Sequence, residues 1–343
     1  MQYGLFFFVS LVFFGFTGVN TYFDISKEDV ELKIPKGFPK PVYTFKNNKL
    51  SPEVFVLGRR LFYDPVLSKD STTSCASCHQ RIAAFAHIDH ALSHGINGLI
   101  GKRNVPALQN LIWNDAFMWD GGVNHLEVQP LSPITNPIEM NESIAHVIVK
   151  LKADPAYVAE FKKAFGDTTI SSERILKSLA QFTGLMISSN SRYDKYINGE
   201  DTFSLAEKRG LELFREKCGT CHKEPLFTDN SYRNNGLKPD TSLKDKGRGA
   251  ITGSESENYA FKVPSLRNVE MTYPYMHDGR FRNLSQVLDH YGSAEKYGAN
   301  VSKEMYEIGP LSDQGKKDII AFLRTLSDKT FIYDRRFVDP SVK

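Results

Sequence analysis

Two copies of a C-x-x-C-H motif constrain this chain more than any other feature of its sequence. They read Cys75-Ala-Ser-Cys78-His79 and Cys218-Gly-Thr-Cys221-His222. Two thiols at this spacing can add to the two vinyl groups of one haem, and the histidine that follows then lies beneath the iron as its proximal ligand. All four cysteines of the chain belong to these motifs, so none remains for a structural disulfide.

Two other kinds of site use paired cysteines. A four-cysteine zinc site would use the thiols but gives no reason for a histidine directly after each pair. A thioredoxin-like redox disulfide belongs in a βαβ context, which the pattern does not indicate. We therefore expect two covalently attached c-type haems.

The first 20 residues predict export. They carry no charge, and an apolar run extends from Leu5 to about Gly18, which is short for a membrane span. The segment also lacks a basic n-region and an A-x-A-like cleavage site, so an uncleaved anchor stays open beside a cleaved signal peptide. We expect the rest of the chain to lie in the periplasm. The net charge of +3 argues against a nucleic-acid partner.

The rest of the chain predicts a mainly α fold. A first helix is expected from Ser51-Pro52 and ends before Asp64-Pro65. Further helices are expected from Asn141, over 155–165, over 171–189, from Ser204 and over 312–328. Residues 66–140 and 228–260 read as loops. Two domains are expected, at 45–198 and 199–330, and a repeat supports duplication: L-G-R-R-L-F (57–62) precedes the first cysteine pair and R-G-L-E-L-F (209–214) precedes the second.

Further motifs carry a resemblance over residues 50–330. They are GKRNVPALQN (101–110), FMWDGG (117–122), LEVQP (126–130), NPIEM (136–140), VPSLRNVEMTYPYMHDGRF (263–281) and VLDHYG (287–292). In order and spacing they resemble the bacterial di-haem cytochrome c peroxidases and their MauG relatives. The resemblance implies two c-type cytochrome domains with a calcium ion between them.

The same resemblance implies roles for single residues. The haem on Cys75, Cys78 and His79 is the peroxide site, and the haem on Cys218, Cys221 and His222 stores and relays electrons. Glu139 matches the acid–base residue, which suits a carboxylate that moves a proton between peroxide oxygens. Gln129 matches a second polar residue over that haem, although a surface amide is the alternative. Trp119 matches the aromatic residue between the haems, and a core tryptophan is compatible with that role.

Three more residues match the calcium positions of the family. Asn104 supplies a side-chain oxygen, and Thr272 and Pro274 supply backbone carbonyls, which are donors suited to a hard cation. From the sequence alone, Asn104 before Val-Pro would be a turn residue.

The first departure from the peroxidases concerns a histidine that caps their peroxide-binding haem. Counted back from Asn104 without gaps, that position is Ile96. His94 lies two residues away, and it could replace the capping histidine of this haem only if the loop that contains Gly95 and Gly98 shifts. His87 and His90 are expected to be solvated loop histidines. We therefore expect an open iron that needs no reductive activation.

The second departure concerns the sixth ligand of the second haem. The peroxidases place a methionine fourteen residues after the histidine of their P-Y-x-H segment, and here that position holds Tyr291, as in MauG-like members. Met276 is the competing candidate and His290 the third. Methionine would raise the haem potential, whereas tyrosinate would stabilise oxidised states.

Three functions follow as hypotheses. The first is a periplasmic peroxidase that reduces hydrogen peroxide with electrons from a small cytochrome c or cupredoxin, possible as a homodimer. The second is a MauG-like oxidase of a protein or organic substrate. The third, a non-enzymatic electron carrier, requires two six-coordinate haems, and Glu139 beside an open iron argues against it.

Overall fold

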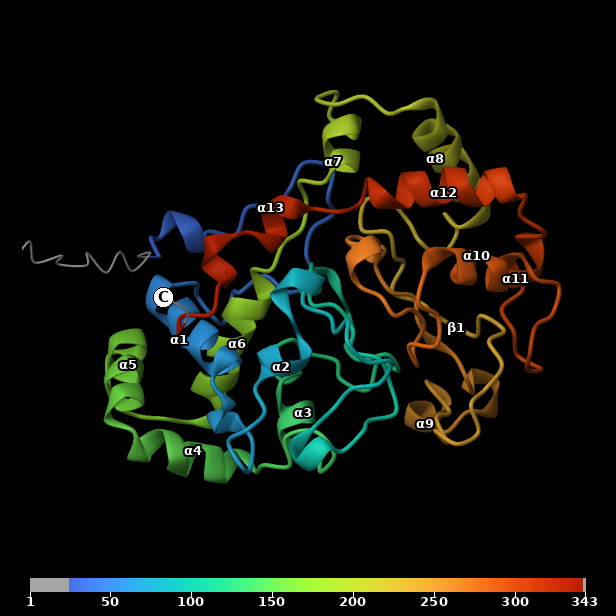
Figure 1. The fold of residues 1–343 in the computed structure, drawn as a ribbon. Coiled ribbons are helices and arrows are strands. Elements are labelled where there is room, and N and C mark those ends of the chain that lie inside the picture. Colours follow the sequence, from blue (N-terminus) through green and yellow to red (C-terminus); the bar gives the residue numbers. More distant parts are fainter. Residues whose placement is uncertain (1–24, 342–343) are drawn as a thin grey trace, which may run out of the picture.

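The computed structural model describes residues 25–341, so the predicted export signal or anchor at residues 1–20 lies outside the described residues. The expected mainly α fold is confirmed: helices and loops dominate (Figure 1). The strands β1 (Tyr232–Arg233) and β2 (Phe261–Lys262) pair antiparallel as one short ribbon. Within residues 25–341, no helix combines the length and apolar character needed to cross a membrane.

The helices divide between two lobes, with α1 to α6 in one and α8 to α12 in the other (Figure 1). Their bounds are α1 Pro52–Tyr63, α2 Cys75–Cys78, α3 Leu131–Thr135, α4 Ile144–Ala153, α5 Pro155–Phe165, α6 Ser172–Gly184, α7 Arg192–Ile197, α8 Leu205–Lys217, α9 Gly249–Thr252, α10 Leu284–Gly292, α11 Glu304–Glu307, α12 Asp313–Arg324 and α13 Lys329–Ile332.

Local capping explains where the helices begin. Ser51 caps α1 by accepting from the Val54 amide, and Ser204 forms a capping box with Glu207 at the start of α8, both as expected. The expected start of α4 at Asn141 was wrong, because this residue has φ +48° and Ser143 is the cap. Helix α6 likewise ends at Gly184, earlier than expected.

The sequence repeat corresponds to a repeated helix crossing. Helix α1 crosses α6 at Gly58, where a Cβ atom would lie 1.9 Å from the Ser178 carbonyl oxygen. Helix α8 crosses α12 at Gly210, where a Cβ atom would lie 1.9 Å from the Asp318 carbonyl oxygen. Only glycine permits this backbone approach, so the two halves use the same device to bring a helix pair together.

Segments near both ends of the described residues, around Phe38 and from α13 to Phe337, join the halves. After α12 the chain returns to the first lobe through α13 (Figure 1), and Phe337 is buried there while its carbonyl accepts from the Tyr63 hydroxyl. In the N-terminal arm, Phe38 packs edge-on against Trp113 and beneath the Arg267 guanidinium. The limits given above for two domains stay a prediction, because these segments contact both halves.

Candidate active site

One cavity of about 930 Å³ extends between the two lobes. Its wall includes Cys78 and His79 from the first motif and Cys218 and His222 from the second. A smaller cavity of about 120 Å³ adds Cys221 and shares Cys218 and His222. The fold therefore brings both C-x-x-C-H motifs to one connected space.

Each motif histidine is held in the same way. Nδ1 of His79 lies 2.8 Å from the Phe85 carbonyl oxygen, and Nδ1 of His222 lies 3.1 Å from the Phe227 carbonyl oxygen. Burial lowers the pKa of His79 to about 4, so its imidazole is neutral, as an iron ligand must be. No disulfide joins any of the four motif cysteines, so their sulfur atoms remain available for attachment to a haem. The residue types, the burial and the orientation of both motifs therefore suit the attachment of two c-type haems.

A carboxyl group faces the first motif. Glu139 lines the large cavity with Cys78 and His79, and it follows the turn after α3. The Asn136 amide donates a 2.9 Å hydrogen bond to Glu139 Oε1. Burial raises the pKa of the Glu139 carboxyl above its ordinary value, although the Asn136 hydrogen bond opposes this. Gln129 also lines the cavity, and its Nε2 lies 3.8 Å from Met118 Sδ.

Two matching hairpins form the centre of the site. Phe117 pairs with Val123, and Tyr275 pairs with Phe281, each across a five-residue turn. The second residue of each hairpin has a left-handed backbone, with φ +68° at Met118 and +74° at Met276. Trp119 and His277 therefore occupy equivalent positions in the two halves, which extends the duplication beyond the repeat seen in the sequence.

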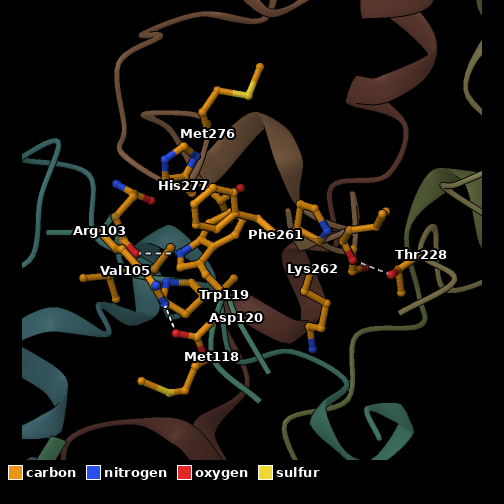
Figure 2. Close-up of a pocket in the computed structure, with 18 of the residues that line it drawn as sticks. Arg103, Val105, Met118, Trp119, Asp120, Thr228, Phe261, Lys262, Met276 and His277 are labelled. Carbon is orange, nitrogen blue, oxygen red and sulfur yellow. Dashed lines mark hydrogen bonds and ion pairs between the residues drawn. The ribbon is translucent and has the colours of Figure 1, made fainter. Parts of the chain in front are cut away.

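Trp119, His277 and Phe261 all line the cavity, and their rings lie close together in Figure 2. The Phe261 and His277 rings stack with centroids 3.7 Å apart, and Trp119 Nε1 donates to the Asn104 carbonyl at 2.8 Å. Arg103 bridges Asp120 and Asp245 through ion pairs of 2.6 Å each. The hydrogen bond to the Asn104 carbonyl fixes Trp119 in the cavity wall.

The orientation of helix α10 determines that Tyr291 reaches the cavity and His290 does not. Leu284, Val287, Leu288 and Tyr291 occupy one helical face, and all four line it. His290 points elsewhere, because its Nε2 lies 3.1 Å from the Asn235 carbonyl oxygen. Met276 lines the same cavity as Tyr291. Burial raises the pKa of Tyr291, while a hydrogen bond from Asn235 acts in the opposite direction.

The loop that carries the capping histidine in the peroxidases offers no imidazole to the cavity within the described residues. Ile96 is buried at 3% exposure, and neither it nor His94 is among the lining residues. The His94 ring instead lies 4.2 Å from His90 and 6.4 Å from His87, centroid to centroid. His87 was expected to be solvated and this was wrong: it is buried, with Nδ1 unpaired.

The three histidines do not form a metal site. In residues 25–341, no group of three His, Cys, Asp or Glu side chains is arranged to hold a metal ion.

The predicted calcium residues lie close to the centre of the site. Asn104, Thr272 and Pro274 all line the large cavity. The Asn104 amide nitrogen donates to the Ala91 carbonyl at 2.9 Å, which leaves its oxygen available. Among the described residues, no hydrogen bond occupies the Thr272 or Pro274 carbonyl. Side-chain amide and backbone carbonyl oxygens such as these three are ligands that a hard cation prefers.

Sequence reasoning missed two amides of the site. Asn136 lies in the NPIEM motif, from which the sequence analysis took only Glu139, although asparagine before proline is a turn signal. Asn235 lies in a polar segment with no motif. The similarity between F-M-W-D-G (117–121) and Y-M-H-D-G (275–279) could have predicted that the two segments form matching hairpins.

Comparisons with known proteins agree with this geometry. A profile of the family described as di-haem cytochrome c peroxidase matches residues 52–202. The methylamine utilization protein MauG of Methylorubrum extorquens is 37% identical over 308 residues, 88% of this chain and 85% of its own. The cytochrome c551 peroxidase of Nitrosomonas europaea is 35% identical over 277 residues, 79% of each chain.

Among solved structures, a MauG-like protein associated with microbial copper homeostasis superposes with a TM-score of 0.82 at 33% identity. The match covers 90% of this chain and 99% of that one.

Proposed function

The chain belongs to the di-haem cytochrome c peroxidase and MauG family, and from that premise we propose that it is a periplasmic peroxidase. It reduces hydrogen peroxide to water with electrons from a small soluble carrier, a cytochrome c or a cupredoxin. The observation that carries the proposal is Glu139, a carboxyl group with a raised pKa in the cavity wall shared with Cys78 and His79.

The two C-x-x-C-H motifs hold the cofactors. Cys75, Cys78 and His79 would hold the first haem, and Cys218, Cys221 and His222 would hold the second. When bound, the haems supply redox-active iron that takes electrons from a donor and delivers them to peroxide.

Glu139 moves the proton. Reduction of peroxide requires one oxygen to lose its proton and the departing oxygen to gain one, and a partly buried carboxyl can do both in turn. The Asn136 hydrogen bond orients the carboxyl, and Gln129 offers an amide that both donates and accepts. Trp119 connects the two halves of the cavity and relays electrons between them, since it lies in the wall between the motifs.

Three further assignments belong to this proposal. Tyr291 would supply the sixth ligand of the second haem, with Met276 as its competitor, because both line the cavity and His290 does not. His94 would not supply a ligand to the first haem, because its ring packs on His90. Asn104, Thr272 and Pro274 bind one calcium ion through the oxygens described above.

A second candidate function is MauG-like oxidation of a protein or organic substrate. Two observations favour it: Tyr291 faces the cavity, and no histidine of the capping loop does. The 33% identity to the MauG-like protein associated with copper homeostasis also supports it.

Stopped-flow kinetics with hydrogen peroxide and a reduced cytochrome c test the main proposal. We expect turnover that falls roughly 100-fold or more in Glu139→Gln. Full turnover in that variant would remove Glu139 from the mechanism. Rapid reaction of the oxidised protein with peroxide, but no oxidation of any reduced carrier, would favour the MauG-like function instead.

A further inference from the structure

Lys262 is a cationic residue of the site that the proposed mechanism leaves unused. It ends strand β2, and its side chain lies beside the cavity in Figure 2. Its Nζ donates a 2.9 Å hydrogen bond to the Ala116 carbonyl, and its backbone amide donates a 2.7 Å hydrogen bond to the Trp119 carbonyl. Lys262 therefore ties β2, in the second half of the chain, to the segment that carries Trp119 in the first.

The ammonium group of Lys262 has more donors than the protein satisfies. It has three N–H groups, and among the described residues its one hydrogen-bond acceptor is the Ala116 carbonyl. Burial lowers the pKa of Lys262 to about 8, while the charge of Asp115 opposes this shift, so the group is still mostly protonated at pH 7. A charge held away from water with unused donors is costly unless a further acceptor binds it.

Within residues 25–341, no carboxylate forms an ion pair with Lys262, in contrast to the arginines of the same cavity. Nη1 of Arg103 lies 2.6 Å from Oδ2 of Asp120, and Nη1 of Arg233 lies 3.3 Å from Oε1 of Glu304. Those two charges are neutralised inside the protein. The charge of Lys262 therefore remains for an anionic group that the cavity binds.

The position of Lys262 indicates which group this is. Lys262 lines the small cavity, whose wall contains Cys218, Cys221 and His222 but no residue of the first motif. A c-type haem attached to these residues carries two propionate carboxylates, and neither the two thiols nor the imidazole binds them. A carboxylate and an ammonium group form a charge-assisted hydrogen bond, which is stronger than one between neutral groups.

We propose that Lys262 binds a propionate carboxylate of the second haem and raises the reduction potential of that haem. The inference deepens the proposed function, because it rests on the placement of this haem at Cys218, Cys221 and His222. The ammonium group offsets the negative charge of the propionate and disfavours the extra positive charge of ferric iron, so both effects act in the same direction. Through Ala116, Lys262 also links this haem to the other half of the cavity.

The test uses the full di-haem protein without peroxide and measures the reduction potential of each haem and the propionate bending bands of the resonance Raman spectrum. Lys262→Gln keeps a donor for the Ala116 carbonyl but removes the charge, Lys262→Met removes both, and Lys262→Arg keeps the charge. Lys246→Gln is the matched control, because Lys246 lines the large cavity but is exposed. Circular dichroism and haem content establish that each variant is folded and loaded.

We expect Lys262→Gln and Lys262→Met to shift the potential of the second haem to more negative values and to shift propionate bending bands. The potential of the first haem stays near its wild-type value in both. Lys262→Arg keeps the wild-type potentials, and Lys246→Gln changes neither the potentials nor the bands, since solvent screens an exposed charge.

Wild-type potentials and bands in Lys262→Gln would overturn the proposal, because the hydrogen bond to Ala116 would then be the whole role of Lys262. A shift confined to the first haem would also overturn it, and so would equal shifts in Lys262→Arg and Lys262→Met. These measurements need no turnover. Absence of peroxidase activity would therefore refute the proposed function and leave the role of Lys262 to be decided by the potentials.

Discussion

The side-chain amide of Asn136 donates a 2.9 Å hydrogen bond to Oε1 of Glu139. The same side chain accepts from the Ile138 amide at 3.0 Å, so the amide is fixed by the turn that carries the carboxyl. The proposed acid–base residue and its amide partner are thus three residues apart, within one turn of the chain.

The first prediction concerns the pH dependence of turnover. Asn136→Asp keeps the oxygen that accepts from Ile138 but replaces the donor by a like charge, which raises the pKa of Glu139 further. Because the carboxylate is the base, the acid limb of the kcat/KM profile moves to higher pH. Asn141→Asp, in the same loop, is the matched control. An acid limb that stays in place would show that Glu139 does not govern it.

The second prediction concerns the resting state of the first haem. Since the His94 ring packs on His90 and not in the cavity, His94→Ala leaves the high-spin EPR signal unchanged. His90→Ala is the matched control for the histidine cluster. The appearance of a new high-spin signal in His94→Ala alone would mean that His94 caps the iron.

The third prediction concerns the helix crossing in the second half. Gly210→Ala places a Cβ against the Asp318 carbonyl, and this clash costs about 1–3 kcal/mol in the free energy of unfolding. Gly315→Ala is the control on the partner helix, because its nearest neighbour is the Ser312 hydroxyl at 3.2 Å. Thermal melting of both variants checks this, and equal melting temperatures would contradict it.

The fourth prediction concerns a buried ion pair. Arg267 is 0% exposed and its guanidinium holds Asp194 through bonds of 2.8 and 2.9 Å. Removing the cation in Arg267→Met leaves the carboxylate buried alone and costs about 3–5 kcal/mol. Arg174→Met breaks the more exposed pair with Asp167, and we expect a much smaller loss of stability because solvent screens this pair. Urea unfolding at neutral pH measures both.

The Asp194 pair also has a pH signature. Burial raises the pKa of Asp194, but the hydrogen bonds and charge of Arg267 outweigh it and hold the pKa below its ordinary value. A depressed carboxyl pKa stabilises the fold above the ordinary value near 3.8, and this stability is lost as the pH falls through the folded-state pKa. We expect Asp194→Asn to flatten the loss of stability below about pH 4.

The fifth prediction concerns calcium. A cation that binds only the folded chain raises its melting temperature, so a chelator selective for calcium lowers it and added calcium restores it. Asn104→Ala loses most of this response because one oxygen donor is gone. Melting temperatures that are equal with and without chelator would argue against a calcium site at Asn104.

Local chemistry made part of this molecule predictable. The spacing of Cys75, Cys78 and His79 is a property of neighbouring residues, and so are the Ser51 and Ser204 caps, which begin their helices where expected. Asn141 was assigned to a helix wrongly because its left-handed backbone depends on the turn it shares with Asn136, whose carbonyl accepts its amide.

Short runs of adjacent residues were enough to predict the haem-binding motifs, the mainly helical fold and the internal repeat. Helical periodicity places Tyr291 on the face of α10 that Leu284 and Leu288 share, but the structure was needed to show that this face lines the cavity. It also showed that His290 meets the Asn235 carbonyl, a contact between segments 55 residues apart that a local pattern does not encode.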